Sequence, residues 1–597
     1  MIVAKSCADL FGLLAQHKKI SFDSETTGLN WQRGDYAFMW AFGIKDEELL
    51  FDLRGQSPAP FYEYFHRFLQ DSSHTLIGAN PKFDLHMIPE LKDYQAHVHD
   101  VQVMARFLRS DRLTVGLDAL AKERGLQKLD TVKEWIKKNK AYRFEKVGDN
   151  LEKIPRYDAV PEEIIYPYAA GDARLAYDLF DIYTDELHAL NKYNLALNPP
   201  KDVFKALETE EKVTRVLFKM ESRGVCIDEE YTRTALTVER ARAVGSCKDF
   251  KEITGRDFKD SAKLFTEVFG DAGGVLESAP RTEKGSYSFT DTFLSSVKHP
   301  AAKAITTHRE AHKKSRTYYT NFLELRGRNG RIHTNFRQSS TATGRLSCSD
   351  PNLQNVSTED DSQYQVRGCF VAPEDYYMVA IDYQAQEMRL MLDLAAELKV
   401  INEVKAGKDL HQATADLLNI TRKQAKNINF GILYGMGVGK LANSLGVSVE
   451  VAKVLKRRYF MSLPNVYSLV SKVTERAAKG RLANIAGRVY QFDSKFAYKG
   501  VNYLIQGSSA EITKAAMIEC EKYLDDKLSK LILSVHDELV FYVHKTEVDE
   551  VVPQIAEIMK NAYVHTFLPM DVGIEIGTRW SDLESWNTYG TEKRNNL

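Results

Sequence analysis

Two apolar segments near the C-terminus are separated by a short acidic one. Residues 531–533 and 539–541 are apolar, and they flank a stretch that contains His536, Asp537 and Glu538. This pattern predicts a β-hairpin with carboxylates at its tip. Because unpaired carboxylates are costly to bury, acids at such a tip face water or a metal ion.

A further β-prone segment also ends on an acid. Residues 378–381 read Met-Val-Ala-Ile and are followed by Asp382. Two strands that each bring an aspartate to one point form a ligand set for a pair of Mg²⁺ ions, which is the minimum apparatus for nucleotidyl transfer. Asp382 and Asp537 are therefore candidate metal ligands. Glu538 is either an auxiliary acid of this site or a solvated turn carboxylate.

Polar and apolar positions alternate near the N-terminus as well. In residues 18–28 the alternation predicts a strand that carries Asp23 and Glu25 on one face. Two neighbouring carboxylates on one face repel each other unless a cation lies between them. Asp84, in the segment Asn-Pro-Lys-Phe-Asp, adds a third acid.

A helix is predicted to begin at Pro167, because proline is favoured in the first turn of a helix. Tyr168 and Asp172 lie four residues apart and therefore share one face of this helix. The N-terminal third thus offers four carboxylates and one phenol as candidates for a second site.

Charged and aromatic residues recur every four positions from Arg422 through Lys426 and Phe430 to Tyr434. Each step advances about 400°, or about 40° beyond a full turn, so the four form one slanting stripe on a helix. Two cations followed by two aromatics are unusual for a core-packing face, and they suit a nucleoside triphosphate. Lys426 can also act as the general acid for a leaving pyrophosphate. For Tyr434 an ordinary amphipathic helix is the alternative.

The composition is that of a globular protein with several domains. The 597 residues exceed what one core holds, and 44% hydrophobic and 27% charged residues are ordinary fractions. The formal net charge of −1 gives no sign of a nucleic-acid partner, although clustered basic residues can still bind DNA. Such clusters occur at 133–146, 326–331 and 453–458, where solvated surface is the alternative interpretation.

Cysteine usage and hydropathy indicate the cellular compartment of the protein. The six cysteines are scattered without a CxxC pair, which argues against a structural zinc site and predicts a reducing environment. No apolar run is long enough to span a bilayer, and the N-terminus lacks a signal-peptide pattern. The expected protein is soluble and cytoplasmic, in the host cell if it is phage-encoded.

Several short motifs follow one another between residues 333 and 538. They include Thr-Ala-Thr-Gly-Arg-Leu-Ser at 341–347, Asp-Pro-Asn-Leu-Gln-Asn at 350–355, Lys-Asp-Leu-His at 408–411, Ile-Gln-Gly at 505–507 and His-Asp-Glu at 536–538. In this order and spacing they resemble the motifs of family A DNA polymerases. Ahead of them, the segments Asp-x-Glu, Asn-x-x-x-Asp and Tyr-x-x-x-Asp resemble the three motifs of DEDDy 3′–5′ exonucleases.

The resemblance implies an α/β exonuclease domain with an RNase H-like mixed sheet, followed by an α+β right-hand polymerase domain. The expected limits are 1–195 for the exonuclease, 196–345 for the thumb and the start of the palm, 346–404 for the palm, 405–495 for the fingers, and 496–597 for the C-terminal part of the palm. Because Asp23 lies almost at the N-terminus, no 5′ nuclease domain is expected.

The resemblance also implies roles for the exonuclease residues. Two metal ions would be held by Asp23, Glu25, Asp84 and Asp172, while Tyr168 would orient the attacking water. A degenerate exonuclease kept only as a scaffold is the alternative, and the presence of all five residues argues against it.

In the polymerase part, the resemblance implies that Asp382 and Asp537 bind two Mg²⁺ ions, with Mn²⁺ as an alternative ion. Glu387 is expected to act as a steric gate that excludes a ribose 2′-OH. The remaining nucleotide contacts are expected from Arg422, Lys426, Phe430, Tyr434 and His411. Hydrogen-bond donors to the minor groove at the primer end are expected from Arg345, Asn502, Gln506 and His536. Such donors test the geometry of a base pair without reading its sequence.

The expected function is template-directed DNA synthesis with 3′–5′ proofreading, as in a bacteriophage replicative enzyme. The expected partners are primer–template DNA, dNTPs and a single-stranded DNA 3′ end, with a monomeric enzyme and replisome proteins as further candidates. The alternatives are a bacterial repair-type polymerase, a nuclease with a vestigial polymerase half, and a non-catalytic scaffold that binds primer–template DNA.

Overall fold

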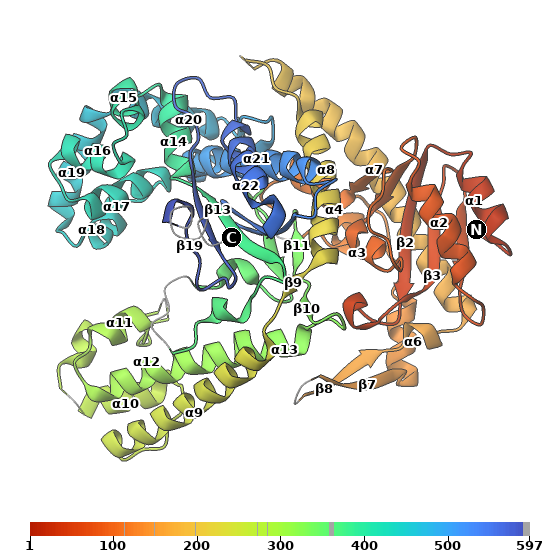
Figure 1. Cartoon of the computed structure of the whole chain (residues 1–597), viewed down its shortest axis with the longest axis horizontal. Helices are drawn as coiled ribbons and strands as arrows, with labels where there is room; N and C mark the ends of the chain where they lie inside the picture. Colours follow the sequence, from red (N-terminus) through yellow and green to blue (C-terminus); the bar gives the residue numbers. More distant parts are fainter. Residues whose placement is uncertain are drawn as a thin grey trace.

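The computed structural model describes residues 1–112, 114–147, 150–197, 199–271, 273–282, 284–357 and 363–588. An N-terminal body, at the right of Figure 1, is joined to a larger C-terminal body. Two helical projections of the C-terminal body, one yellow-green and one teal, lie on either side of a central sheet (Figure 1). No helix in the described part of the chain combines the length and the hydrophobicity that a bilayer crossing requires.

The N-terminal body is built on a six-stranded mixed sheet with the strand order β1-β4-β3-β2-β5-β6. Strand β2 pairs antiparallel with β3 and parallel with β5. Every residue of β3 is buried, as expected for an apolar strand covered on both faces. The strands are β1 (Ile2–Val3), β2 (Lys19–Thr26), β3 (Ala37–Gly43), β4 (Glu48–Asp52), β5 (Thr75–Gly78) and β6 (His97–Asp100). This sheet confirms the predicted mixed-sheet domain.

Helices cover the sheet, and the longest of them, α7, packs against β2 and β3. A separate two-stranded hairpin, β7–β8, extends from this body. The α-helices and the hairpin strands are α1 (Cys7–Leu14), α2 (Ala59–Leu69), α3 (Pro81–His86), α4 (Val101–Leu108), α5 (Leu117–Glu123), α6 (Thr131–Asn139), β7 (Tyr142–Val147), β8 (Asn150–Pro155) and α7 (Glu162–Leu195).

Helix α8 (Val203–Arg223) connects the two bodies and contacts both, with α3 and β6 on one side and α21 on the other. The first projection, here called the thumb, follows it and has its own aromatic core that includes Phe250, Phe265 and Phe289. The thumb consists of α9 (Glu229–Thr254), α10 (Ala262–Asp271), α11 (Asp291–Ser296), α12 (Pro300–Lys313), the π-helix η4 (Lys314–Thr320) and α13 (Asn321–Leu325).

The central sheet, here called the palm sheet, has five antiparallel strands in the order β16-β17-β13-β18-β19. The predicted hairpin is present, because β16 and β17 are separated only by His536 and Asp537. The strands are β13 (Tyr376–Tyr383), β16 (Lys530–Val535), β17 (Glu538–His544), β18 (Val572–Gly577) and β19 (Glu584–Ser585). Helices α14 (Gln386–Ala395), α21 (Gly500–Tyr523) and α22 (Val548–Asn561) accompany the sheet.

The second projection, here called the fingers, consists of six helices inserted between α14 and α21. They are α15 (Leu398–Lys405), α16 (Leu410–Leu418), α17 (Arg422–Leu433), α18 (Val438–Leu445), α19 (Val449–Ser462) and α20 (Pro464–Ala478). Short strands complete the C-terminal body, namely β9 (Val225–Cys226), β10 (Arg331–Ile332), β11 (Asn335–Arg337), β12 (Ser347–Ser349), β14 (Arg481–Ala483) and β15 (Val489–Gln491).

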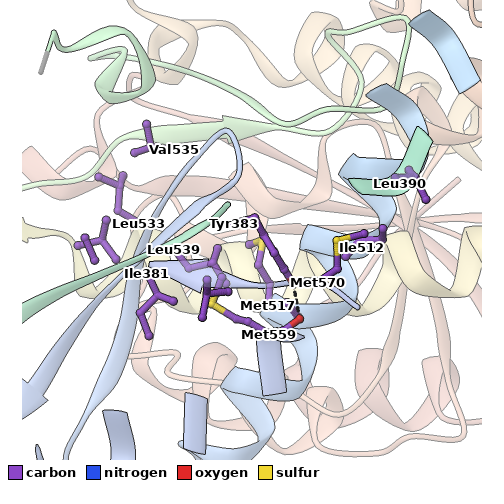
Figure 2. Close-up of a cluster of buried hydrophobic side chains, with 14 of the residues drawn as sticks. Ile381, Tyr383, Leu390, Ile512, Met517, Leu533, Val535, Leu539, Met559 and Met570 are labelled. Atoms are coloured by element: carbon purple, nitrogen blue, oxygen red, sulfur yellow. Dashed lines mark hydrogen bonds between the residues drawn. The ribbon is translucent and has the colours of Figure 1, made fainter. Parts of the chain in front are cut away.

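A continuous apolar core holds the palm sheet to its helices (Figure 2). Within it, the Tyr383 hydroxyl donates a 2.7 Å hydrogen bond to the carbonyl of Met559. The core therefore fixes the strand that carries Asp382. The residues labelled in Figure 2 are Ile381, Tyr383, Leu390, Ile512, Met517, Leu533, Val535, Leu539, Met559 and Met570.

Candidate active sites

Three carboxylates meet in the N-terminal body. Asp23 and Glu25 come from β2 and Asp172 comes from α7, and ligand oxygens of all three lie within 4.8 Å of one another. Among the described residues, no other group of three His, Cys, Asp or Glu side chains is as compact. Carboxylate oxygens are the ligands that hard divalent cations prefer, so this cluster fits Mg²⁺.

Asp84 lies beside this group but outside the compact trio. It is buried on α3, and its Oδ1 accepts hydrogen bonds from the backbone N–H and the hydroxyl of Ser24, at 3.0 and 2.6 Å. Ser24 is the residue between Asp23 and Glu25 on β2. The fourth predicted acid is therefore held next to the strand that carries the first two.

Tyr168 is buried on the same helix as Asp172, and their four-residue spacing is as predicted. The predicted start of that helix is wrong, because α7 begins at Glu162 and Pro167 lies inside it. A proline inside a helix removes one backbone hydrogen bond, and the remaining bonds of this 34-residue helix continue on both sides.

Lys128 is a member of this site that the sequence did not reveal. Its ammonium group pairs with Asp172 and lies 5.1 Å from the centre of the Tyr168 ring. Lys128 lies between α5 and α6, in a segment with no periodic pattern, so no sequence signal marked it. The lysine supplies a positive charge among the carboxylates.

Burial raises the pKa of each of these carboxylates, and repulsion among them adds to the effect at Asp23 and Glu25. The pKa of Glu25 rises to about 8 and that of Asp84 to about 7, while Lys128 opposes the rise at Glu25. The pKa of Asp23 is raised well above its usual range by burial and by Asp84, Asp172 and Glu25. A site of this kind binds a divalent cation in exchange for protons.

A second set of carboxylates lies at one end of the palm sheet. Asp382 on β13 is the direct antiparallel partner of Glu538 on β17, and the N–H of Tyr383 donates to the carbonyl of Asp537 at 3.3 Å. The strand register therefore brings the predicted acids together, although these carboxylates are less compact than the N-terminal trio.

The negative charges of these palm acids repel one another. Desolvation by the surrounding protein raises the pKa of Asp382 to about 8, and repulsion from Asp537 and Glu538 adds to the effect. The Asp382 side chain nevertheless stays accessible to solvent. Burial raises the pKa of Glu538 to about 7, and its Oε1 is buried without a hydrogen-bond partner. Glu575 on β18 adds negative charge, and no sequence motif marked it. An unsatisfied, mutually repelling carboxylate set fits a divalent cation.

Glu387 lies on α14 and is buried. Its Oε1 pairs with a guanidinium nitrogen of Arg345, and its Oε2 accepts a 3.3 Å hydrogen bond from the hydroxyl of Tyr434. The predicted gate residue is thus in contact with one residue predicted to touch DNA and one predicted to touch the nucleotide.

The predicted stripe lies on α17, which begins at Arg422 after a capping box formed by Thr421 and Gln424. Arg422 and Lys426 are exposed, and the guanidinium of Arg422 pairs with Asp409 at 2.8 Å.

The aromatic half of the stripe lies farther along the same helix, where the rings of Phe430 and Tyr434 stack with centroids 5.9 Å apart. His411 on α16 lies 5.9 Å from the Phe430 ring. Tyr434 forms the C-cap of the helix.

The four residues predicted to contact DNA are brought together only in part. Arg345, His536 and Asp537 line one small cavity with an accessible volume of about 20 Å³. Asn502 and Gln506 lie four residues apart on α21, partly exposed, and do not line this cavity.

The chain matches two family models. Residues 237–582 match the model of DNA polymerase family A, and residues 4–188 match a 3′–5′ exonuclease model. The polymerase model thus covers more than half of the chain, and the exonuclease model covers the N-terminal body.

Relatives in bacteria share this sequence over long regions. The thermostable DNA polymerase I of Thermus aquaticus is 32% identical over 400 residues, which are 62% of this chain and 48% of that protein. The DNA polymerase I of Helicobacter pylori is 28% identical over 464 residues, 74% of this chain and 51% of that protein. That of Pseudomonas aeruginosa is 26% identical over 608 residues, 95% of this chain and 64% of that protein. The chain spans about half the length of most of these relatives.

The fold is shared with a solved structure, described as the POL domain of Pol1 from M. smegmatis in complex with DNA primer-template and dNTP. The TM-score is 0.79 at 23% identity, over 97% of this chain and 99% of that one. This likeness shows that the two chains share one fold over nearly their whole lengths. The chain is a member of DNA polymerase family A and carries a 3′–5′ exonuclease domain.

Proposed function

We propose that the protein is a template-directed DNA polymerase that extends a primer 3′ end with dNTPs and removes 3′ ends with a separate exonuclease. The observation that carries this proposal is the presence of two carboxylate clusters, one at the sheet of each body. Asp23, Glu25 and Asp172 form one, and Asp382 with the tip of the β16–β17 hairpin forms the other. One set of acids would suffice for a simple nuclease.

Both clusters have the donor set for divalent cations. When bound, a pair of Mg²⁺ ions activates the attacking oxygen and stabilises the leaving group. In the palm, Asp382 and Asp537 would hold the ions and Glu538 would assist. In the N-terminal body, the ions would be held by Asp23, Glu25, Asp84 and Asp172, with Tyr168 orienting the attacking water.

The stripe of charged and aromatic residues on α17 would bind the incoming nucleotide. Arg422 and Lys426 place positive charge where the phosphates would lie, and Phe430 and Tyr434 offer aromatic faces to the sugar and base. His411 adds a phosphate contact. Glu387 would close the space needed by a 2′-OH, so the substrates would be dNTPs. Primer-end contacts are proposed for Arg345, Asn502, Gln506 and His536.

We also propose the domain limits given above, with the exonuclease at 1–195 and the fingers at 405–495. These limits contain α16 to α20, while α15 of the same projection lies before them except for its last residue. The partners would be primer–template DNA, dNTPs and single-stranded 3′ ends. The relatives named here are bacterial DNA polymerases I, so they give no support to the expected phage origin and favour the repair-type alternative. A reducing cytoplasm would suit the six cysteines, which are all free thiols.

One assay tests this function. A labelled primer on a longer template is incubated with Mg²⁺, with and without the four dNTPs. The proposal predicts full-length product with dNTPs and stepwise 3′ shortening without them. Shortening under both conditions would favour a nuclease with a vestigial polymerase half. An unchanged primer under both conditions would favour a binding scaffold.

A further inference from the structure

The short helix α3 has two faces that contact two different parts of the molecule. Asp84 bonds Ser24 of β2 in the N-terminal body. Lys82 and His86, two residues before and after Asp84, are turned about 200° away from it around the helix and contact α8. The six-residue helix that carries Asp84 of the candidate exonuclease site is therefore also in contact with α8.

Glu221 of α8 is the residue that both Lys82 and His86 reach. Its side chain is 4% exposed, its Oε1 pairs with the Lys82 ammonium, and its Oε2 lies 2.7 Å from Nε2 of His86. The backbone N–H of Phe336 also donates to Oε1, at 2.5 Å. The Glu221 carboxylate is thus held by three groups from two separate segments, α3 and β11.

Ring packing adds to this contact. The His86 imidazole stacks between Trp31 and Phe218, with centroid distances of 4.4 and 4.7 Å. Lys82 also donates a 3.2 Å hydrogen bond to Oδ1 of Asn335. Because α3 is a single short helix, its position depends on contacts of this kind rather than on its own hydrogen bonds.

We propose that Glu221 is a positioning residue of the 3′–5′ exonuclease site. Its interactions with Lys82 and His86 fix α3, so that Asp84 stays beside Asp23 and Glu25. The inference rests on the proposed exonuclease function. Its consequence is that the exonuclease ligand set is complete only when the polymerase part of the chain is docked against it. Removing the Glu221 charge would loosen Asp84 and weaken metal binding, while Asp382 and Asp537 of the palm, which Glu221 does not contact, would stay in place.

The test uses the full chain with Glu221→Gln, which preserves side-chain size but removes the charge. The matched control is Glu211→Gln on the same helix, whose carboxylate pairs with His97 and His99 of β6 at 2.5 and 3.6 Å rather than with α3. Mn²⁺ affinity is measured by isothermal titration calorimetry in an Asp537→Ala background, so that the N-terminal site is observed. Exonuclease kcat and KM on a single-stranded oligonucleotide are measured in parallel.

Loss of a group that contacts a metal ligand directly typically weakens metal affinity about 10- to 100-fold. Glu221 acts on Asp84 one step farther out, through α3, so we expect Glu221→Gln to weaken Mn²⁺ binding about tenfold and to lower kcat, with KM for DNA and primer extension unchanged. Glu211→Gln should leave all four quantities as they are in the wild type. Wild-type Mn²⁺ affinity in Glu221→Gln, or equal losses in both variants, would overturn the proposal.

A second variant keeps the test decisive if Glu221→Gln folds poorly. Lys82→Met removes the same ion pair from the other side and should cause a similar loss, and the double variant should lose no more than either single one. Additive losses would show that the two residues act independently and would overturn the proposal. The wild type and Asp23→Ala separate the two hypotheses. If the wild type releases no more nucleotides from 3′ ends than Asp23→Ala does, the proposed exonuclease function fails, whatever Glu221 does.

Discussion

The hydroxyl of Tyr434, at the end of fingers helix α17, donates a 3.3 Å hydrogen bond to Oε2 of Glu387 on palm helix α14. The other carboxylate oxygen of Glu387 pairs with Arg345. The proposed gate residue is therefore held from two sides, and it links the proposed nucleotide-binding stripe to Arg345 in the palm. This position is the basis for the first prediction.

We predict that Glu387→Ala raises ribonucleotide incorporation relative to deoxyribonucleotide incorporation by at least about tenfold, or about 1.4 kcal/mol. Alanine would leave space for a 2′-OH that the longer side chain excludes. The measurement is the ratio of kcat/KM for a matched rNTP and dNTP. Glu387→Gln, which keeps the bulk, should retain the wild-type ratio. An unchanged ratio in Glu387→Ala would show that Glu387 is not the gate.

The second prediction concerns Phe430. In the proposed binding mode its ring offers no hydrogen bond near the sugar, so the 3′-OH of a bound dNTP organises the phosphates of the nucleotide itself, and dideoxynucleotides should be rejected. Phe430→Tyr supplies a hydroxyl that can replace the lost contact, which is worth about 1.5–3 kcal/mol, or roughly ten- to a hundred-fold in selectivity.

Incorporation of dideoxy- and deoxynucleotides is compared for both forms on an Asp23→Ala background, so that excision does not hide terminators. A wild type that accepts both substrates equally would contradict the placement of Phe430.

The third prediction follows from the raised pKa values of Glu25, about 8, and Asp84, about 7. Because the folded protein holds these protons more tightly than the unfolded chain, whose carboxyl pKa values are about 4, the free energy of unfolding should fall as pH rises from about 5 to about 8. Mg²⁺ should restore stability, most strongly near pH 8, where the carboxylates are already deprotonated.

The measurement is Tm across this pH range with EDTA and with Mg²⁺. Glu25→Gln removes one carboxylate with a raised pKa, so Tm should fall less steeply with pH in the metal-free variant than in the metal-free wild type. The exposed acid Glu230 on α9 provides the control, since Glu230→Gln should leave the wild-type slope. Identical slopes in all three proteins would count against this electrostatic account of the site.

Much of both sites could be predicted from local patterns. Strand ends that carry aspartates indicated Asp382 and Asp537, and alternation indicated Asp23 and Glu25. Helical spacing correctly placed Tyr168 with Asp172, and Phe430 with Tyr434. These signals succeed because the period of a strand or a helix determines which neighbouring side chains share a face.

Contacts between distant segments could not be predicted in this way. Lys128 pairs with Asp172, and Glu221 pairs with Lys82, because tertiary packing brings distant segments together. No periodic pattern in these segments marks either contact. The predicted start of α7 at Pro167 is also wrong, because a proline is favoured in the first turn of a helix yet is tolerated inside a long, well-packed one. Isolated charged residues gain their roles only from the fold.

The central claim is that two separate acidic sites perform two separate reactions. It is tested most directly by measuring primer extension and 3′ degradation side by side in Asp23→Ala and Asp537→Ala. The account predicts that Asp23→Ala loses degradation and extends primers at nearly the wild-type rate, while Asp537→Ala stops extension and still shortens single-stranded 3′ ends. Loss of both activities in either variant would contradict the two-site account.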